Sequence, residues 1–396
     1  MSSRTDRNWV EGLLGRREWL KRTLAAPVAV SAVGLTGRRN LAADEKAGPS
    51  GPILRQKGPE NLEYPFSTLD RFLTPNDLFY VRTHFEVPEL NPGDWRLKVE
   101  GVVEKPLTLD LEEIKRLPST TMTAMLECAG NGRMHLPAPQ PGIRWDLGGV
   151  SNAEWTGVPL SAILDQAGVK SSAVEVILEG ADRGQLSGTP GEIVFARSLP
   201  IEKARQPEVL LAYKMNGEDL PKRHGFPVRV VVADWYGMAS VKWLTRIRVI
   251  DRPFDGFFQT FNYTIWQRRD GLPNLVPVTE MQVKSQIARP ASYEVVPRGK
   301  PYLVRGAAWA GSSSIARVEI SADGGKTWSQ AKLTGKSVPH AWRFWEWEWS
   351  APDRTGPLVL MSRATDSEGR TQPMTRDPDR RDAMINHVFP IEVVLR

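Results

Sequence analysis

Cysteine is almost absent from this chain of 396 residues, because Cys128 is the only one. A single cysteine excludes an intramolecular disulfide and leaves one thiol that must be buried, reactive or bound to a metal. The sequence also lacks the CxxCH signature of an attached c-type haem and the glycine-rich fingerprints of nucleotide sites. Its five histidines show no spacing typical of a zinc site. Electrons released by a redox reaction on this chain must therefore pass to another molecule.

Long apolar runs are absent as well, and no stretch approaches the roughly 20 residues that span a bilayer, so we expect no membrane span. In residues 1–43, Arg16 and Arg17 precede a weakly apolar stretch at 24–35. This arrangement resembles a twin-arginine export signal and predicts a periplasmic protein, with an amphipathic surface helix as the alternative. The segment holds eight Lys and Arg, so most of the formal charge of +6 belongs to it. Nucleic acid is therefore not an expected partner.

Composition and periodicity predict two domains behind this leader. The many prolines and glycines, 31 and 33, favour short strands and structured loops. Residues 44–62 are polar, without periodicity, and predict a linker or a surface arm. Residues 63–275 mix short helical patterns at 108–118 and 155–168 with β-rich runs and predict an α+β domain. The β-rich runs lie at 95–103, 174–180, 226–233 and 241–250.

Residues 276–396 have almost no helical period and predict an all-β sandwich of immunoglobulin type. Trp345, Trp347 and Trp349 alternate with glutamates, which places three indoles on one face of a strand. A second alternating run at 315–321 leads directly into the turn residues that begin at Asp323.

The segment LECAGNGR at 126–133 is the sharpest candidate for chemistry. Gly130 and Gly132 let the backbone approach a bulky group and leave amide N–H groups free to face an anion. A guanidinium nearby, such as that of Arg133, favours the thiolate form of Cys128. A buried structural cysteine and a soft thiolate ligand to a metal are both consistent with this pattern.

Two further segments combine basic side chains with aromatic or small neighbours. In FYVRTHF, at 79–85, Arg82 and His84 point to the same side if the segment is extended. In the segment 223–244, several side chains offer hydrogen-bond donors suited to a phosphate-bearing ligand, namely His224, Arg229, Ser240 and Lys242. Each cluster alone is also consistent with a solvated charged face.

In order and spacing, these segments resemble the sulfite oxidase family of molybdopterin enzymes from about Phe66 to the C-terminus. The matching motifs are CAGN at 128–131, HGFPVR at 224–229, SVKWL at 240–244 and DGGKTW at 323–328. The resemblance implies a cofactor of molybdenum bound by molybdopterin, a sulfite-oxidase-like catalytic domain over 63–275, and an immunoglobulin-like dimerisation domain over 276–396.

The resemblance also implies a role for each candidate residue. Cys128 is the expected thiolate ligand of molybdenum, and Arg82 and Arg133 are expected to line an oxyanion pocket. Tyr263, in FNYTIW, is the expected tyrosine at the reactive centre, and Trp145, in IRWDLGG, borders the substrate pocket. The expected contacts to the pterin and its phosphate are His84, His224, Arg229, Ser240 and Lys242.

The implied activity is oxidation of sulfite to sulfate by oxygen-atom transfer in a homodimer, with a soluble c-type cytochrome or oxygen as the external electron acceptor. The chain departs from the family pattern at Thr83, where members proven on sulfite have Asn, and at Ala239, where they have Arg. The alternatives are a reductase of nitrate or of an S-oxide with the same cofactor, and a non-catalytic binding module.

Overall fold

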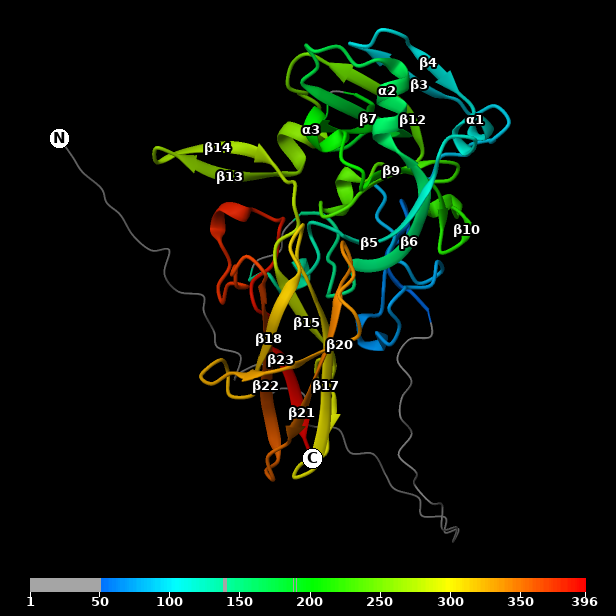
Figure 1. The fold of residues 1–396 in the computed structure, drawn as a ribbon. Helices are drawn as coiled ribbons and strands as arrows, with labels where there is room; N and C mark the ends of the chain where they lie inside the picture. The colour runs from blue at the N-terminus through cyan, green and yellow to red at the C-terminus, as the bar shows by residue number, and fades with distance from the viewer. Residues whose placement is uncertain (1–50, 138–140, 188, 190) are drawn as a thin grey trace, which may run out of the picture. The chain divides into compact units, whose positions relative to one another are not determined.

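The computed structural model describes residues 51–137, 141–187, 189 and 191–396, which belong to the unit Ala47–Arg396 (Figure 1). The export signal predicted over 1–43 lies outside the described residues. Among the residues that the structure describes, no helix is both long and apolar enough to cross a membrane.

Two five-stranded sheets form the framework of the first section. In one, the strand order is β10-β9-β6-β5, with β11 also paired to β9, and in the other it is β4-β3-β12-β7-β8. The strands of the first sheet are β5 (Thr120–Glu127), β6 (Val150–Pro159), β9 (Val209–Met215), β10 (Glu218–Asp219) and β11 (Arg229–Val232). Those of the second are β3 (Leu97–Gly101), β4 (Leu107–Leu109), β7 (Glu175–Gly184), β8 (Ile193–Pro200) and β12 (Leu244–Ile250).

In the described part of the chain, three short α-helices accompany these sheets: α1 (Leu111–Lys115), α2 (Leu160–Ala167) and α3 (Ile201–Ala204). The helical pattern at 108–118 is confirmed only over α1, which begins at a capping box between Asp110 and Glu113. Its start was placed too early, because residues 108 and 109 belong to β4. The helix expected over 155–168 was wrong at its start, because residues up to Pro159 belong to β6. These residues pair with both β5 and β9, and this pairing outweighs the local helical pattern. The expected end is correct, since Gly168 adopts a left-handed conformation at the C-cap.

The segment predicted as a linker or arm over 44–62 contains regular structure where it is described. Strand β1 (Ile53–Gln56) pairs with β2 (Asn61–Glu63) in an antiparallel hairpin. The Asn61 side chain is buried and accepts a hydrogen bond from the Thr83 amide at 3.0 Å. The polar composition of this segment therefore reflects a hairpin with specific hydrogen bonds, which periodicity over so few residues does not reveal.

The C-terminal section consists of two sheets, as expected for a sandwich. The strand orders are β15-β17-β21-β20 and β16-β23-β22-β18-β19. The first sheet contains β15 (Lys284–Arg289), β17 (Pro301–Trp309), β20 (Lys332–Thr334) and β21 (Arg343–Ser350). The second contains β16 (Val295–Val296), β18 (Ile315–Ser321), β19 (Ser329–Gln330), β22 (Gly356–Asp366) and β23 (Ile391–Leu395). Trp345 and Trp349 in β21 are buried, in agreement with the alternation in the sequence.

A two-stranded ribbon, β13 (Thr264–Arg269) and β14 (Leu272–Pro277), connects the two sections and projects from the framework (Figure 1). The domain boundary predicted between residues 275 and 276 falls inside β14. A five-residue π-helix, η6 (Phe258–Asn262), immediately precedes Tyr263 and the ribbon. Such helices are rare and are frequently found at functional sites.

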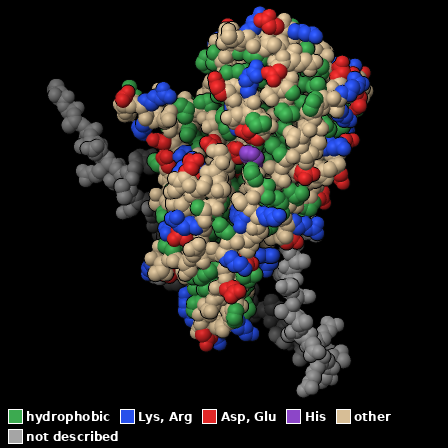
Figure 2. All heavy atoms as spheres, in the orientation of Figure 1, with side chains coloured by type: hydrophobic (Ala, Val, Ile, Leu, Met, Phe, Trp, Pro, Cys, Tyr) green, Lys and Arg blue, Asp and Glu red, His purple; other side chains and the backbone are tan. Residues whose placement is uncertain are grey.

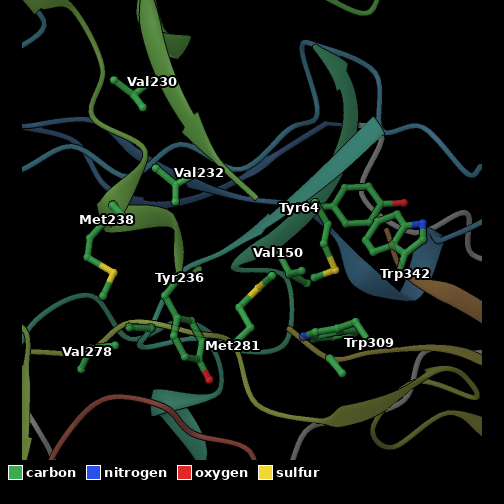
Figure 3. Packing of buried hydrophobic residues seen from close by; sticks show 14 of the residues in the cluster. Tyr64, Val150, Val230, Val232, Tyr236, Met238, Val278, Met281, Trp309 and Trp342 are labelled. Atoms are coloured by element: carbon green, nitrogen blue, oxygen red, sulfur yellow. The ribbon is translucent and has the colours of Figure 1, made fainter. Parts of the chain in front are cut away.

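One hydrophobic cluster includes residues of both sections. Tyr236, of the first section, belongs to this cluster together with Met281 and Trp309 of the C-terminal section, and Figure 3 shows the three side chains. The Trp342 indole also donates a hydrogen bond to the Phe72 carbonyl at 3.0 Å. The two sections therefore share one core, and burial of these large side chains stabilises their association.

The surface in Figure 2 shows basic and acidic side chains interspersed over the visible face. This face therefore carries no extended field of a single sign.

Candidate active site

A pocket lies in the first section beside the CAGN turn and encloses about 620 Å³, counting the space at its mouth. Eight of the ten residues predicted for the site line it: Arg82, His84, Cys128, His224, Arg229, Ser240, Lys242 and Tyr263. They come from segments up to 181 residues apart, and the two sheets bring them together.

Cys128 directly follows β5 and is held by its own backbone. Its amide donates to the Gly149 carbonyl at 2.8 Å, and its carbonyl accepts from the Asn131 amide at 2.8 Å. The side chain is 6% exposed and faces the pocket. The thiol is thus fixed in place, which suits a ligand to a metal better than a mobile nucleophile.

His84 and Tyr263 form a hydrogen-bonded pair, with 2.7 Å between the His84 Nε2 and the Tyr263 hydroxyl. The His84 ring stacks on Phe195 at a centroid distance of 4.7 Å. Burial, together with the positive charges of Arg82 and Lys242, holds the pKa of His84 well below its usual value. Burial also raises the pKa of Tyr263. Both groups are therefore neutral near pH 7, and the hydroxyl can donate to the imidazole.

His224 ends the 3-10 helix η4 (Lys222–His224), and its Nε2 donates to the Asn76 carbonyl at 2.9 Å. Because a carbonyl only accepts, this bond fixes the tautomer and leaves Nδ1 as an acceptor. Burial lowers the pKa of His224 to about 3, so the ring stays neutral.

Arg229 is buried without a carboxylate partner among the described residues. Its guanidinium donates to the carbonyls of His224 at 3.0 Å and Ser240 at 3.1 Å, and it lies over the Trp155 ring at 4.9 Å. Burial lowers its pKa to about 10, which still leaves it charged at neutral pH. A buried cation held only by neutral acceptors creates a positive potential that favours an anionic ligand.

Ser240 and Lys242 complete this side of the pocket. The Ser240 hydroxyl accepts from the Val232 amide at 3.0 Å, so its own proton remains available to a ligand. The Lys242 ammonium donates to the Arg223 carbonyl at 3.0 Å and lies 4.1 Å from the Trp243 ring centroid. Burial and the nearby Arg229 hold the pKa of Lys242 well below its usual value. An anionic ligand would restore the charged ammonium.

Asp182, on β7, also lines the pocket, and sequence reasoning missed it. It is the one carboxylate among the described residues of the lining, and its Oδ1 is buried without a hydrogen-bond partner among the residues described. Burial raises the pKa of Asp182 to about 7, opposed mainly by Lys242. A single aspartate in a strand carries no signal of spacing, so only the fold reveals its position.

Arg133 and Trp145 differ from the expectation, because neither lines the pocket. The Arg133 guanidinium donates instead to the carbonyls of Ile143 at 2.8 Å and Asp382 at 2.9 Å. Its charge still lowers the pKa of Tyr263, so it lies within electrostatic range of the pocket. Trp145 is fully buried in the same hydrophobic cluster as Cys128 and packs edge-on against Tyr80, which lines the pocket.

The residues present fit a cofactor of metal, dithiolene and phosphate. Cys128 offers a soft sulfur donor to a metal. Arg229, Lys242 and Ser240 offer donors to phosphate oxygens. The unpartnered Asp182 oxygen and the His224 Nδ1 offer acceptors to the N–H groups of a pterin ring. A buried carboxylate oxygen without a partner is costly, and such a ligand would satisfy it.

Comparison with protein families gives two matches that together follow the two sections. Residues 84–258 match the family described as "Oxidoreductase molybdopterin binding domain". Residues 276–395 match the family described as "Mo-co oxidoreductase dimerisation domain".

Among curated proteins, similar chains include sulfite oxidase of Gallus gallus, 38% identical over 84% of this chain and 75% of that protein. Mitochondrial sulfite oxidase of Homo sapiens is 35% identical over 81% of this chain and 61% of its own length. Nitrate reductase [NADH] 1 of Arabidopsis thaliana is 33% identical over 86% of this chain, but only 40% of that protein is covered.

Among solved structures, the sulfane dehydrogenase SoxCD from Paracoccus pantotrophus is similar in fold. The two chains superpose with a TM-score of 0.76 at 31% identity, covering 90% of this chain and 93% of the other. The similarity therefore extends over both sections.

Proposed function

Because this chain belongs to the sulfite oxidase family of molybdopterin oxidoreductases, we propose that it oxidises sulfite to sulfate at the pocket beside Cys128. Its cofactor is molybdenum bound by molybdopterin, as in the rest of this family. In the proposed reaction sulfite gains one oxygen atom derived from water and releases two electrons and two protons.

Cys128 would bind the metal of the cofactor. Five further lining residues would hold the rest of it: Asp182, His224, Arg229, Ser240 and Lys242. When bound, the molybdenum centre supplies the redox chemistry and the oxygen-atom transfer. The residues around the metal centre bind the substrate and orient it. Arg82 lines the same pocket, and its positive charge attracts the substrate anion.

The neutral pair of Tyr263 and His84 would supply hydrogen bonds at the site. The Tyr263 hydroxyl carries one proton, which it can donate in a hydrogen bond either to a substrate oxygen or to the imidazole nitrogen 2.7 Å away. Since burial keeps both groups uncharged, they add hydrogen bonding without weakening the positive potential of the pocket.

The observation that carries the proposal is the charge of the pocket lining. Arg82, Arg229 and Lys242 face one pocket together with Cys128, and Asp182 is the only carboxylate among its described lining residues. The cofactor phosphate would neutralise part of this charge. The remainder favours a small oxyanion over a neutral S-oxide.

A steady-state assay tests the proposal with purified, molybdenum-containing protein. Sulfite should reduce ferricytochrome c, or consume oxygen, in a saturable reaction that yields one sulfate for each pair of electrons. Molybdenum-loaded protein that shows no sulfite turnover with either acceptor would overturn the assignment of the substrate.

A second candidate substrate is nitrate, because the similar chains include a plant nitrate reductase. Nitrate is also a small anion, so the charge of the pocket does not distinguish it from sulfite. A third candidate substrate, suggested by the name of the similar solved structure, is a sulfane sulfur compound. Reoxidation of the reduced enzyme by nitrate, followed optically, would distinguish a nitrate reductase from an enzyme that oxidises sulfite or a sulfane sulfur compound.

We further propose that the enzyme is exported through the twin-arginine pathway and delivers its electrons to a soluble c-type cytochrome. The pair Arg16 and Arg17 ahead of an apolar stretch supports export. Replacing both with lysine should retain the protein in the cytoplasm. Unchanged periplasmic recovery of that variant would contradict the proposal.

A further inference from the structure

A buried ion pair links the cysteine turn to the C-terminal section. Glu127, the last residue of β5, immediately precedes Cys128, and Lys284 is the first residue of β15. Their Oε1 and Nζ atoms are 2.8 Å apart, and the side chains are 1% and 0% exposed. The pair is therefore removed from solvent although the residues are 157 positions apart.

Both charged groups have additional partners. The second Glu127 oxygen accepts from the Trp309 indole at 2.9 Å, and the first accepts from the Asn131 amide group at 3.1 Å. Lys284 also donates to the Asn131 carbonyl at 3.1 Å. Trp309, whose position Figure 3 shows, lies at the end of β17 in the C-terminal section. The C-terminal section thus supplies two donors to Glu127.

The same contacts close the turn that contains the thiol. Asn131 donates its backbone N–H to the Cys128 carbonyl, and its side-chain oxygen accepts from the Gly149 amide at 3.0 Å. The Gly149 carbonyl in turn accepts from the Cys128 amide. Asn131 is therefore the residue that closes the turn, and Glu127 and Lys284 hold Asn131 by its side chain and its carbonyl.

Burial of an ion pair is costly, and a well-packed apolar pair often stabilises a fold as much or more. The pair is thus poorly explained by stability alone, whereas charge-assisted hydrogen bonds give defined directions and distances. We propose that Lys284, with Glu127, positions the Cys128 thiol, so that the C-terminal section sets the geometry of the metal ligand. The description of the thiol as a ligand rests on the proposed function, but the positioning itself does not.

Reactivity of the thiol tests this inference directly, because Cys128 is the only cysteine of the chain. Full-length apoprotein, made without molybdate, is treated with a maleimide near neutral pH, and the rate of labelling is measured. Lys284→Met keeps the length of the side chain but removes the donor. We expect labelling at least roughly tenfold faster than in wild type, because the unclamped turn opens more often.

His340→Asn provides a matched control. His340 also pairs across the two sections, with its Nδ1 2.9 Å from Asp234, and its carbonyl accepts from Met125 on the same strand β5. This variant therefore removes an ion pair between the sections without touching Asn131. Its labelling rate should equal that of wild type. Equal acceleration in both variants would show general loosening between the sections and would overturn the inference.

Lys284→Met leaves the buried Glu127 without its cation, which destabilises the fold. The double variant Glu127→Gln/Lys284→Met avoids this cost, because both side chains are then neutral. The double variant should fold, as judged by circular dichroism, and should still label faster than wild type, since the contact to the Asn131 carbonyl is missing. A labelling rate of the double variant equal to that of wild type would overturn the inference.

Molybdenum content, measured on the same variants after expression with molybdate, separates this inference from the proposed function. Wild-type protein that contains molybdenum, with a folded Lys284 variant that contains several-fold less, supports both. Wild-type protein without molybdenum would refute the proposed function and leave the labelling result unaffected. An unchanged labelling rate with full molybdenum loading would refute the positioning role alone.

Discussion

Arg82, in the segment 79–85, lines the pocket. If it binds the substrate anion, Arg82→Gln should raise the KM for sulfite by roughly one to two decades, because a charge-assisted hydrogen bond contributes about 1.5–3 kcal/mol. Molybdenum content should stay constant. Arg71→Gln, which removes the same charge from a side chain that is 72% exposed, should leave KM unchanged. The same KM in both variants would remove Arg82 from substrate binding.

Arg133 is expected to behave differently, because its guanidinium is bound by the carbonyls of Ile143 and Asp382. Arg133→Gln leaves these two acceptors without their donor, which should lower the free energy of unfolding by about 1–3 kcal/mol. Thermal unfolding and molybdenum content would both report the loss. We expect the KM of the surviving holoenzyme to change little, and a large rise in KM with full stability would assign Arg133 to the anion pocket.

The sequence predicted most of the residues that line the pocket, but not the buried charged residues around them. Motif resemblance identified Cys128, His224, Arg229 and their neighbours, because their spacing along the chain is specific. Asp182, Glu127 and Lys284 were missed, since charged residues are usually exposed and their burial depends on contacts distant in sequence.

The loop that carries His340 connects the two sections through the ion pair between His340 and Asp234. The hydrogen bond to Asp234 raises the pKa of His340 above its usual value. Stability from this pair is therefore fully present below the unfolded pKa of about 6.5 and is lost as the pH rises through the higher folded pKa. His340→Asn should cost on the order of 1 kcal/mol near pH 5.5 and distinctly less near pH 8.5. Denaturant unfolding at both values measures this, and a pH-independent cost would contradict it.

The elements also show where patterns in the sequence were insufficient. The helical pattern at 155–168 contained a real helix from Leu160 onward, but Trp155 to Pro159 joined a strand. Hydrogen bonding to a strand on each side made this segment a strand, and a single sequence does not reveal which strands will be its partners. In contrast, the alternation of Trp345 and Trp349 with glutamates was sufficient, since one face of that strand is buried.

For the whole molecule, we expect a homodimer formed through residues 276–396, because the matching family is described as a dimerisation domain. Large apolar side chains such as Tyr293, Val295 and Leu303 are at least 47% exposed in this section and could supply part of such an interface. Sedimentation at micromolar concentration should give twice the mass of the chain. A fully active monomer under those conditions would contradict this expectation.

The most direct test of the account is X-ray absorption at the molybdenum edge, comparing wild-type protein with Cys128→Ser. The variant should fold and retain the pterin, but its metal should show one sulfur neighbour fewer than in wild type. Turnover should be lost, because an oxygen donor is a harder ligand than a thiolate. The same sulfur count in both proteins, with near-wild-type activity of the variant, would show that Cys128 does not bind the metal.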